Sequence, residues 1–256
     1  MNKTFNQASI DLILPNYNSA DYISETIDSI INQTLKKWNL IIVDDNSNIE
    51  TKTILKKYSD DPRIKIIWLK RNKNVSFCRN LAIRYAKSEY IAFIDSDDIW
   101  SSEKLTKQLN FMIKNNYYFT YTNYVPFLSE KKHKVFKEIT PAKYFDFNKF
   151  SRDTSIATST MMIKRSSMEN IKFTNTKICE DYFFKCQVLK KTNYAYCLEE
   201  NLTKYRIRKN SLQSNKIRNL YWIWYINKHF NKFGLLHNLI SLFCISFNSL
   251  KKYGFK

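Results

Sequence analysis

Short apolar segments and segments with helical spacing alternate along the first 125 residues. The apolar segments are bounded by polar or turn-forming residues and predict strands at 10–15, 40–43, 64–69, 90–94 and 119–125. Between them, apolar residues recur every three or four positions and predict helices at 23–35, 51–58, 76–85 and 105–112. Ser19 or Asp21 is available as N-cap for the first helix. This alternation is typical of a parallel α/β sheet flanked by helices.

Polar residues follow three of these strands directly. The three polar segments are Pro15–Asn18, Asp44–Ser47 and Asp95–Asp98. The carboxyl ends of parallel strands share one edge of a sheet, and ligands bind there near the point where the strand order reverses. We therefore expect the three segments to form one ligand site.

Three carboxylates stand together in the segment Asp95–Asp98. Burying an ionised carboxylate costs several kcal/mol, and neighbouring like charges raise that cost. A divalent cation with oxygen ligands, its shell completed by a phosphate, is the simplest counter-charge. The alternative is a polar loop whose acids cap the next helix. The two other polar strand ends favour the cation site.

Beyond residue 126 the pattern is irregular. Residues 155–163 are rich in Ser, Thr and Met and predict a further strand. Glu180 and Asp181 stand at the start of a predicted helix whose other side is aromatic and apolar. Because the helix dipole favours carboxylates at an N-terminus, this pair fits either a structural or a catalytic role.

The C-terminal segment 220–250 is apolar and aromatic, with interspersed lysines. It is too short and too interrupted to span a bilayer, but its composition suits helices that lie in the plane of a membrane surface. Helices that pack on the domain are the alternative. We divide the chain into a domain at 1–212, with halves 1–125 and 126–212, and a basic amphipathic helical extension at 213–256.

The charge distribution indicates an anionic partner. The formal net charge is +19, and no acidic residue occurs after Glu200 although basic residues continue to Lys256. A tail of one sign binds an anionic surface, either nucleic acid or anionic lipid.

Glycine and cysteine usage excludes several classes of site. The only glycines are Gly234 and Gly254, so the first 233 residues hold no glycine-rich phosphate loop. The five cysteines include no Cys-x-x-Cys pair, and we expect free thiols in a reducing cytoplasm.

Residues 1–9 are polar and carry no apolar signal core. No run reaches the roughly 18 apolar residues that a membrane-spanning helix needs. We expect a cytoplasmic protein.

Residues 9–210 resemble the family 2 glycosyltransferases, enzymes that use sugar nucleotides. The resemblance implies a GT-A fold, which is a Rossmann-like, mostly parallel sheet flanked by helices, here with a C-terminal helical extension. Its ordered motifs are Leu14–Asn18, Val43–Ser47, Asn72–Asn80, Ile94–Asp98, Glu180-Asp181 and Tyr205–Leu212. Where the family often has glycine, this chain has Asn46 and Asn74, and asparagine tolerates left-handed backbone conformations.

The resemblance also implies how a donor is bound. Asp44 would hydrogen-bond the uracil of a UDP-sugar, and Asp45 belongs to the same nucleotide-binding motif. Pro15, Tyr17 and Asn18 would line the nucleoside pocket.

The phosphates and the sugar would be held by the next two motifs. Arg79 would fix the nucleotide or its phosphates, a task that suits a guanidinium. Asp95 would lie near the ribose or the sugar. Asp97 or Asp98 would hold Mg²⁺ or Mn²⁺ on the diphosphate.

For the reaction, the resemblance implies that Asp181 is the general base, with Glu180 as the alternative. A metal would neutralise the charge that develops on the diphosphate while the carboxylate removes the proton of the acceptor hydroxyl. One base opposite the leaving group implies inversion. The expected reaction is therefore metal-dependent hexosyl transfer to a glycan or lipid-linked glycan of bacterial polysaccharide or lipopolysaccharide. We expect it on the inner face of the cytoplasmic membrane, with the C-terminal segment against anionic lipid.

Two other enzyme or site classes fit less well. Haloacid dehalogenase phosphatases also carry Asp-x-Asp after a strand, but normally after the first strand, and here three predicted strands precede it. A calcium loop would need glycine at Trp100 and glutamate at Thr106.

A basic nucleic-acid-binding protein would explain the charge and the interleaved aromatic residues. It leaves the acidic strand ends unexplained, because acids in such a groove would repel phosphate. We expect no nucleic-acid partner.

Overall fold

The computed structural model describes residues 9–128, 134–176, 178–208 and 215–253. The strands join in one ten-stranded sheet, in which the main order is β3-β2-β1-β4-β9-β6-β10-β5. Their bounds are β1 Ile10–Asn16, β2 Trp38–Asp44, β3 Ile64–Trp68, β4 Tyr90–Phe93, β5 Ile99–Trp100, β6 Phe119–Leu128, β7 Lys134–Val135, β8 Tyr144–Phe145, β9 Met162–Lys164 and β10 Ala195–Arg206. The helices are α1 Ile23–Ile31, α2 Ile49–Lys56, α3 Val75–Tyr85, α4 Lys104–Asn115, α5 Phe147–Phe150, α6 Glu180–Thr192, α7 Lys216–His229 and α8 Leu235–Tyr253.

The long strands of the sheet all run in one direction. Strands β1, β2, β3 and β4 pair in parallel. The short strand β9 is antiparallel to both β4 and β6, so β6 runs the same way as β4, and β10 is parallel to β6. The predicted class, a mostly parallel α/β sheet, is confirmed.

Both faces of the sheet are buried, because successive residues of a strand point to opposite sides. Leu12 and Leu14 pack with Ile27 and Leu105, which come from helices on one face. Ile13 lies in the core on the other face.

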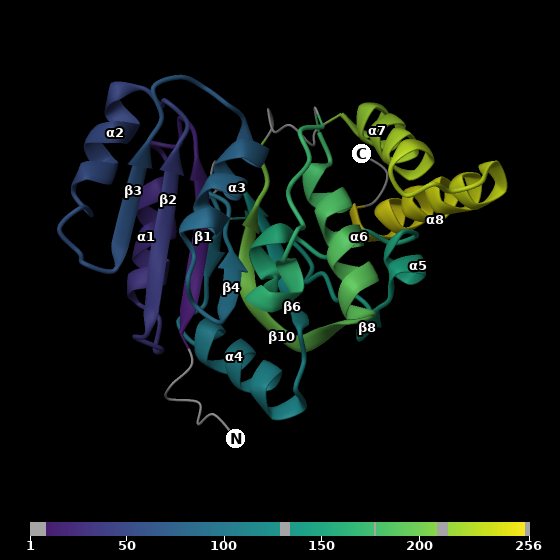
Figure 1. Ribbon diagram of the computed structural model, residues 1–256, viewed down its shortest axis with the longest axis horizontal. Coiled ribbons are helices and arrows are strands. Elements are labelled where there is room, and N and C mark those ends of the chain that lie inside the picture. Colours follow the sequence, from purple (N-terminus) through teal and green to yellow (C-terminus); the bar gives the residue numbers. More distant parts are fainter. Residues whose placement is uncertain (1–8, 129–133, 177, 209–214, 254–256) are drawn as a thin grey trace.

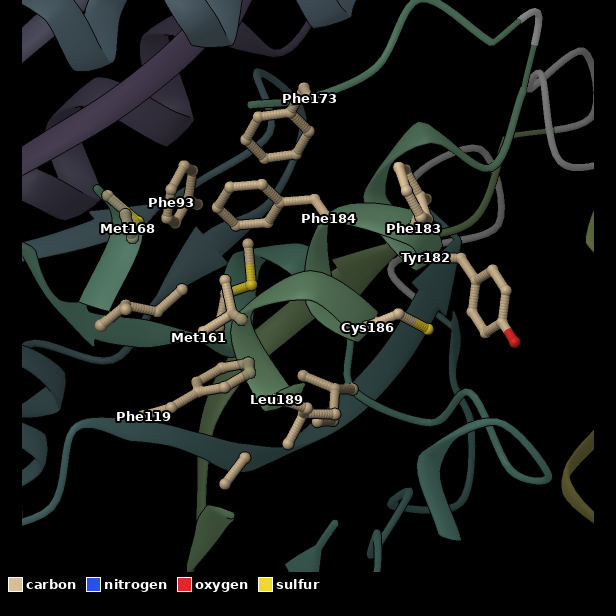
Figure 2. Packing of buried hydrophobic residues seen from close by; sticks show 14 of the residues in the cluster. Phe93, Phe119, Met161, Met168, Phe173, Tyr182, Phe183, Phe184, Cys186 and Leu189 are labelled. Atoms are coloured by element: carbon tan, nitrogen blue, oxygen red, sulfur yellow. The ribbon is translucent and has the colours of Figure 1, made fainter. Parts of the chain in front are cut away.

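The core on the face of the sheet that Ile13 enters, which we call the second core, is strongly aromatic where α6 packs on the sheet. The rings of Phe173 and Phe184 stack 3.9 Å apart, and Phe93 of β4 meets both of them edge-on (Figure 2). This packing fixes the position of α6, whose first residues are Glu180 and Asp181.

Helices α7 and α8 lie beyond α6, at the opposite end of the molecule from β3 and α2 (Figure 1). Ile223 and Ile226 of α7 belong to the second core. In the described parts of the chain no helix is long and apolar enough to cross a bilayer.

The predicted strands and helices of residues 10–125 are confirmed, with shifted ends. Helix α1 ends at Ile31, before the expected Leu35, and its N-cap is Tyr22 without a side-chain hydrogen bond. Both predicted caps are therefore wrong. The Ser19 hydroxyl instead donates to Asn16.

The second half differs more from the prediction. The strand expected over residues 155–163 is wrong for most of that range, where a 3₁₀ turn at Thr158–Thr160 leads into the short β9. The long strand β10 was not predicted, because register shifts against β6 interrupt its alternation of buried and exposed residues.

Asparagine replaces glycine at the sharp turns. Asn18, Asn46 and Asn74 have φ values of 46°, 61° and 77°. Asn46 and Asn74, where the family often has glycine, thus both have a positive φ, and Asn74 combines it with an extended ψ of 165°. All five cysteines are free thiols, as predicted.

Candidate active site

The carboxyl ends of three parallel strands lie side by side at the point where the strand order reverses. Strand β1 has β2 on one side and β4 on the other, and Asn16 is in register with Asp44. The polar segments that follow these strands therefore meet at one edge of the sheet, as the sequence predicted.

Asp44 ties the ends of β1 and β2 together. Its two carboxylate oxygens accept hydrogen bonds from the Asn16 side chain at 2.8 Å and from the Ser47 backbone at 3.1 Å. The Ser47 hydroxyl in turn accepts from the Asn18 backbone at 2.9 Å. Asp44 is fully buried in this arrangement. Because Asp44 is fully buried, a nucleobase can reach its carboxylate only if the residues that cover it move.

The other residues predicted to line the nucleoside pocket are accessible. Pro15 is half-buried, and Tyr17 and Asn18 are exposed at the end of β1. The aromatic ring of Tyr17 is therefore available to a planar ligand.

Asp45 holds the loop that leads into α3. Its carboxylate accepts from the backbone N–H groups of Lys73 at 2.6 Å and Asn74 at 2.9 Å. The Asn74 side chain then caps α3 by accepting from the Phe77 backbone. Asp45 thereby fixes the start of the helix that carries Arg79.

Arg79 connects the end of β4 with the start of α6. Its guanidinium pairs with Asp95 at 2.7 Å and with Glu180 at 2.8 Å. Burial alone would lower the pKa of Arg79, but these two carboxylates raise it. The cation therefore stays charged, and its charge is balanced inside the protein.

Asp97 and Asp98 have different surroundings. Asp98 is buried and accepts from the Arg206 backbone at 2.8 Å. Asp97 lies nearer the surface, and its carboxylate pairs with Nε of Arg208 at 2.7 Å. Burial raises the pKa of Asp97 to about 6 and that of Asp98 well above its ordinary value, although Arg208 opposes the change at Asp97.

Asp181 is held by a buried cation. Nζ of Lys185, one helical turn later, lies 2.7 Å from Oδ2 of Asp181, and the Thr158 hydroxyl donates to the same oxygen at 3.1 Å. Lys185 also donates to the carbonyl of Ile156. Burial alone would raise the pKa of Asp181, but Lys185, with smaller contributions from Arg79 and Thr158, lowers it to about 2. At Glu180, burial and the charge of Asp181 raise the pKa despite Arg79.

The acidic residues fit a divalent cation that is shared with a diphosphate. Within the described residues, no three histidine, cysteine or acidic side chains form a preformed cage for a metal. Mg²⁺ is usually bound by one or two carboxylates together with substrate phosphates and waters. Asp97, as a hard oxygen donor beside the end of β4, matches that pattern.

The basic residues that pair with Asp97, Asp98 and Asp181 were not predicted from the sequence. The spacing of Asp181 and Lys185 could have been recognised as an i, i+4 ion pair. Arg206 and Arg208 lie in the segment Tyr205–Leu212, but no role was assigned to them. Residues 209–212 of that motif lie outside the described residues.

The strand order and the helices on both faces define a GT-A fold. Solved structures with this fold include S. aureus TarS 1–349 in complex with UDP-GlcNAc, with a TM-score of 0.73 and 20% identity over 95% of this chain and 73% of that one. The mannosyltransferase PcManGT from Pyrobaculum calidifontis, in complex with GDP-Man and Mn²⁺, gives a TM-score of 0.70 at 14% identity. That match covers 95% of this chain and 74% of PcManGT.

The family model described as glycosyl transferase family 2 matches residues 11–172, and the chain belongs to this family of glycosyltransferases. The putative teichuronic acid biosynthesis glycosyltransferase TuaG of Bacillus subtilis is 32% identical over 95% of this chain and 96% of TuaG. The Escherichia coli enzyme WfgD, a UDP-Glc:alpha-D-GlcNAc-diphosphoundecaprenol beta-1,3-glucosyltransferase, is also 32% identical. Here the match covers 96% of this chain and 95% of WfgD.

Proposed function

We propose that this glycosyltransferase moves a hexose from a UDP-sugar to a hydroxyl of a lipid-linked glycan, with inversion at the anomeric carbon. The observation that carries the proposal is the full-length similarity to WfgD, whose name gives UDP-Glc as donor and a diphosphoundecaprenol-linked sugar as acceptor. A second E. coli relative, WfaP, has the same named activity at 32% identity over 96% of this chain.

In this proposal, residues 1–125 bind the donor and residues 126–212 bind the acceptor. Pro15, Tyr17 and Asn18 line the nucleoside pocket. Asp44 and Asp45 shape it through the hydrogen bonds described above, and Asp44 reaches the uracil when the residues that cover its carboxylate move.

Arg79 acts between the donor and the catalytic pair. Its ion pairs with Asp95 and Glu180 hold both carboxylates at the edge of the sheet. Asp95 then faces the ribose or the sugar.

The proton of the acceptor hydroxyl goes to Asp181. Lys185 and Thr158 occupy Oδ2, which leaves Oδ1 to accept the proton as the oxygen attacks the anomeric carbon. Attack from the side opposite the diphosphate inverts that centre. Glu180, paired with Arg79, is the alternative base.

Asp97 is the proposed ligand of Mg²⁺ or Mn²⁺, since Asp98 is the more deeply buried of the two. When bound, the metal supplies positive charge to the diphosphate as the bond to the sugar breaks. Arg208 is 41% exposed at its side chain, so it is free to turn from Asp97 toward the phosphates.

The proposal also includes a peripheral position on the inner face of the cytoplasmic membrane, where a lipid-linked acceptor is found. The basic charge after Glu200 supports contact with anionic lipid.

The test is a screen of UDP- and GDP-sugars for release of the nucleotide diphosphate, with and without EDTA and with a diphosphate-lipid-linked sugar as acceptor. We expect turnover with a UDP-hexose, which EDTA abolishes and Mg²⁺ or Mn²⁺ restores. Asp97→Asn should lose this metal-dependent activity. Full turnover of Asp97→Asn in EDTA would contradict the metal role, and turnover with GDP-sugars alone would contradict the donor.

A further inference from the structure

Helix α8 exposes apolar side chains to solvent, whereas an ordinary surface helix exposes polar ones. Each of its exposed residues from 235 to 250 is apolar. They are Leu235, Leu236, Leu239, Ile240, Phe243, Phe247 and Leu250, and we call them the α8 apolar face. Most lie three or four residues apart, so they form one continuous stripe. A monomeric protein in water gains nothing from such a stripe on its surface.

Three polar residues of α8 face the protein instead. The buried Ser241 donates to the Ser151 carbonyl and accepts from the Asn227 side chain at 3.1 Å. Asn238 donates to the Trp224 carbonyl at 3.1 Å, and Asn248 donates to the Arg152 carbonyl.

Asn227 extends this network into the domain, because its side-chain oxygen accepts from the Tyr182 hydroxyl of α6 at 2.7 Å. Buried hydrogen bonds have strict geometry, so they fix the rotation of α8 about its axis. The orientation of the apolar face is therefore built into the fold.

The charges around this face are positive. Lys228 and Lys232 are exposed just before α8, and Lys251 and Lys252 stand in its last turns. Two acids near the helix, Asp146 and Asp153, line a hollow with Cys244 and Asn248, which do not belong to the apolar face.

We propose that the α8 apolar face inserts into the surface of an anionic lipid bilayer, with Lys228 and Lys232, just before the helix, on the lipid headgroups. This pattern of an apolar face flanked by cations is that of a helix lying in the membrane interface. A second copy of the chain fits less well. Both ends of α8 are cationic, so parallel or antiparallel pairing brings like charges together.

This assignment names the element that makes the membrane contact of the proposed function. It rests on the proposed function only in assuming that the acceptor is linked to a lipid. It makes α8 the contacting element, while α7 packs into the core through Ile223 and Ile226.

Vesicle flotation of the full-length chain tests the assignment. The vesicles contain equal parts of phosphatidylcholine and phosphatidylglycerol, or phosphatidylcholine alone. The double variant Phe243→Ser with Phe247→Ser should bind the mixed vesicles about 100-fold more weakly, because two large apolar side chains no longer leave water. The matched control is Ile49→Ser, since Ile49 is 75% exposed but lies on α2, at the other end of the molecule. It should bind like the wild type.

Binding should also weaken without phosphatidylglycerol or in high salt, because the lysines act through screened charges. Circular dichroism and the release of nucleotide diphosphate should stay unchanged in both variants. Undiminished flotation of the double variant would overturn the assignment. So would a wild-type dimer that the double substitution dissociates without altering vesicle binding. If the predicted flotation pattern is seen but no protein turns over a UDP-sugar, the proposed function fails and the assignment of α8 stands.

Discussion

Helices α1 and α8 both carry an apolar stripe, but they turn it in opposite directions. In α1, Ile23, Ile27 and Ile30 are fully buried against the sheet. In α8, Leu239 and Phe243 are 51% and 74% exposed. The difference shows that periodicity identifies a stripe, whereas the hydrogen bonds of the opposite face decide where it points.

In α8, apolar side chains are exposed to solvent. At the candidate active site the opposite occurs, because charged side chains are buried. Arg79 and Lys185 are both buried, and each is paired with carboxylates. Departures from simple polarity rules concentrate at functional sites, since elsewhere they only cost stability. Substitutions at the buried charges, on the exposed apolar face of α8 and in the ordinary core should therefore have different effects.

The largest effect is expected at Asp181. Asp181→Asn removes the proposed base with little change in volume, and general-base catalysis typically contributes ~10²–10⁴-fold to the rate. We expect kcat to fall by about that factor while UDP still binds. Glu180→Gln is the matched comparison. If kcat falls only in Glu180→Gln, the base is Glu180.

Lys185→Met tests the buried pair, because it leaves Asp181 without its cation. Breaking a buried pair in this way destabilises proteins by ~3–5 kcal/mol. In the wild type the pKa of Asp181 is below its ordinary 3.8, so the ionised group stabilises the fold above that pH, and this contribution is lost as the pH falls towards 2. In the variant, the largest opposition to burial is gone, only Arg79 and Thr158 still lower the pKa of Asp181, and that pKa rises.

The acid limb of the kcat/KM profile should therefore move to higher pH in Lys185→Met, and urea unfolding should show the loss of stability. Thr158→Val, which removes only a neutral hydrogen bond, should shift the limb in the same direction by less. An unmoved acid limb in a folded Lys185→Met protein would show that Lys185 does not control Asp181.

The comparison of α1 with α8 can be tested by the same kind of truncation in each. Ile27→Ala should lower the free energy of unfolding by ~2–5 kcal/mol, as for other buried positions. Leu239→Ala should change it by no more than about 0.5 kcal/mol in the absence of lipid. Urea denaturation measures both. Equal losses would mean that the α8 apolar face is covered within the protein.

Local patterns predicted the first half of the fold well. Strands such as β1 and β2 are short, apolar and ended by turn residues, so their sequence carries the whole signal. Strand β10 carries no such signal, because it pairs with three other strands and is interrupted by register shifts. Its existence depends on tertiary pairing.

The sequence predicted the acids of the candidate site, together with Arg79 and the residues after β1, but not the basic partners Lys185, Arg206 and Arg208. The carboxylates follow strands directly and can be found by position along the chain. Their partners are remote, since Arg79 is 101 residues from Glu180 and Arg206 is 108 from Asp98. Whether a buried acid lies near the surface, like Asp97, or is fully enclosed, like Asp98, depends on those distant contacts.

A smaller loss than at Ile27 is expected where asparagine stands at a positive φ. Asn74 combines φ 77° with a side chain that caps α3, so Asn74→Ala should lose both the tolerated conformation and the cap. We expect a loss of about 1–2 kcal/mol. Asn74→Gly loses the cap but adopts this backbone conformation without strain, and should stay within about 0.5 kcal/mol of the wild type. If alanine and glycine are equally destabilising in urea unfolding, then the cap alone, and not the backbone conformation, explains why asparagine stands there.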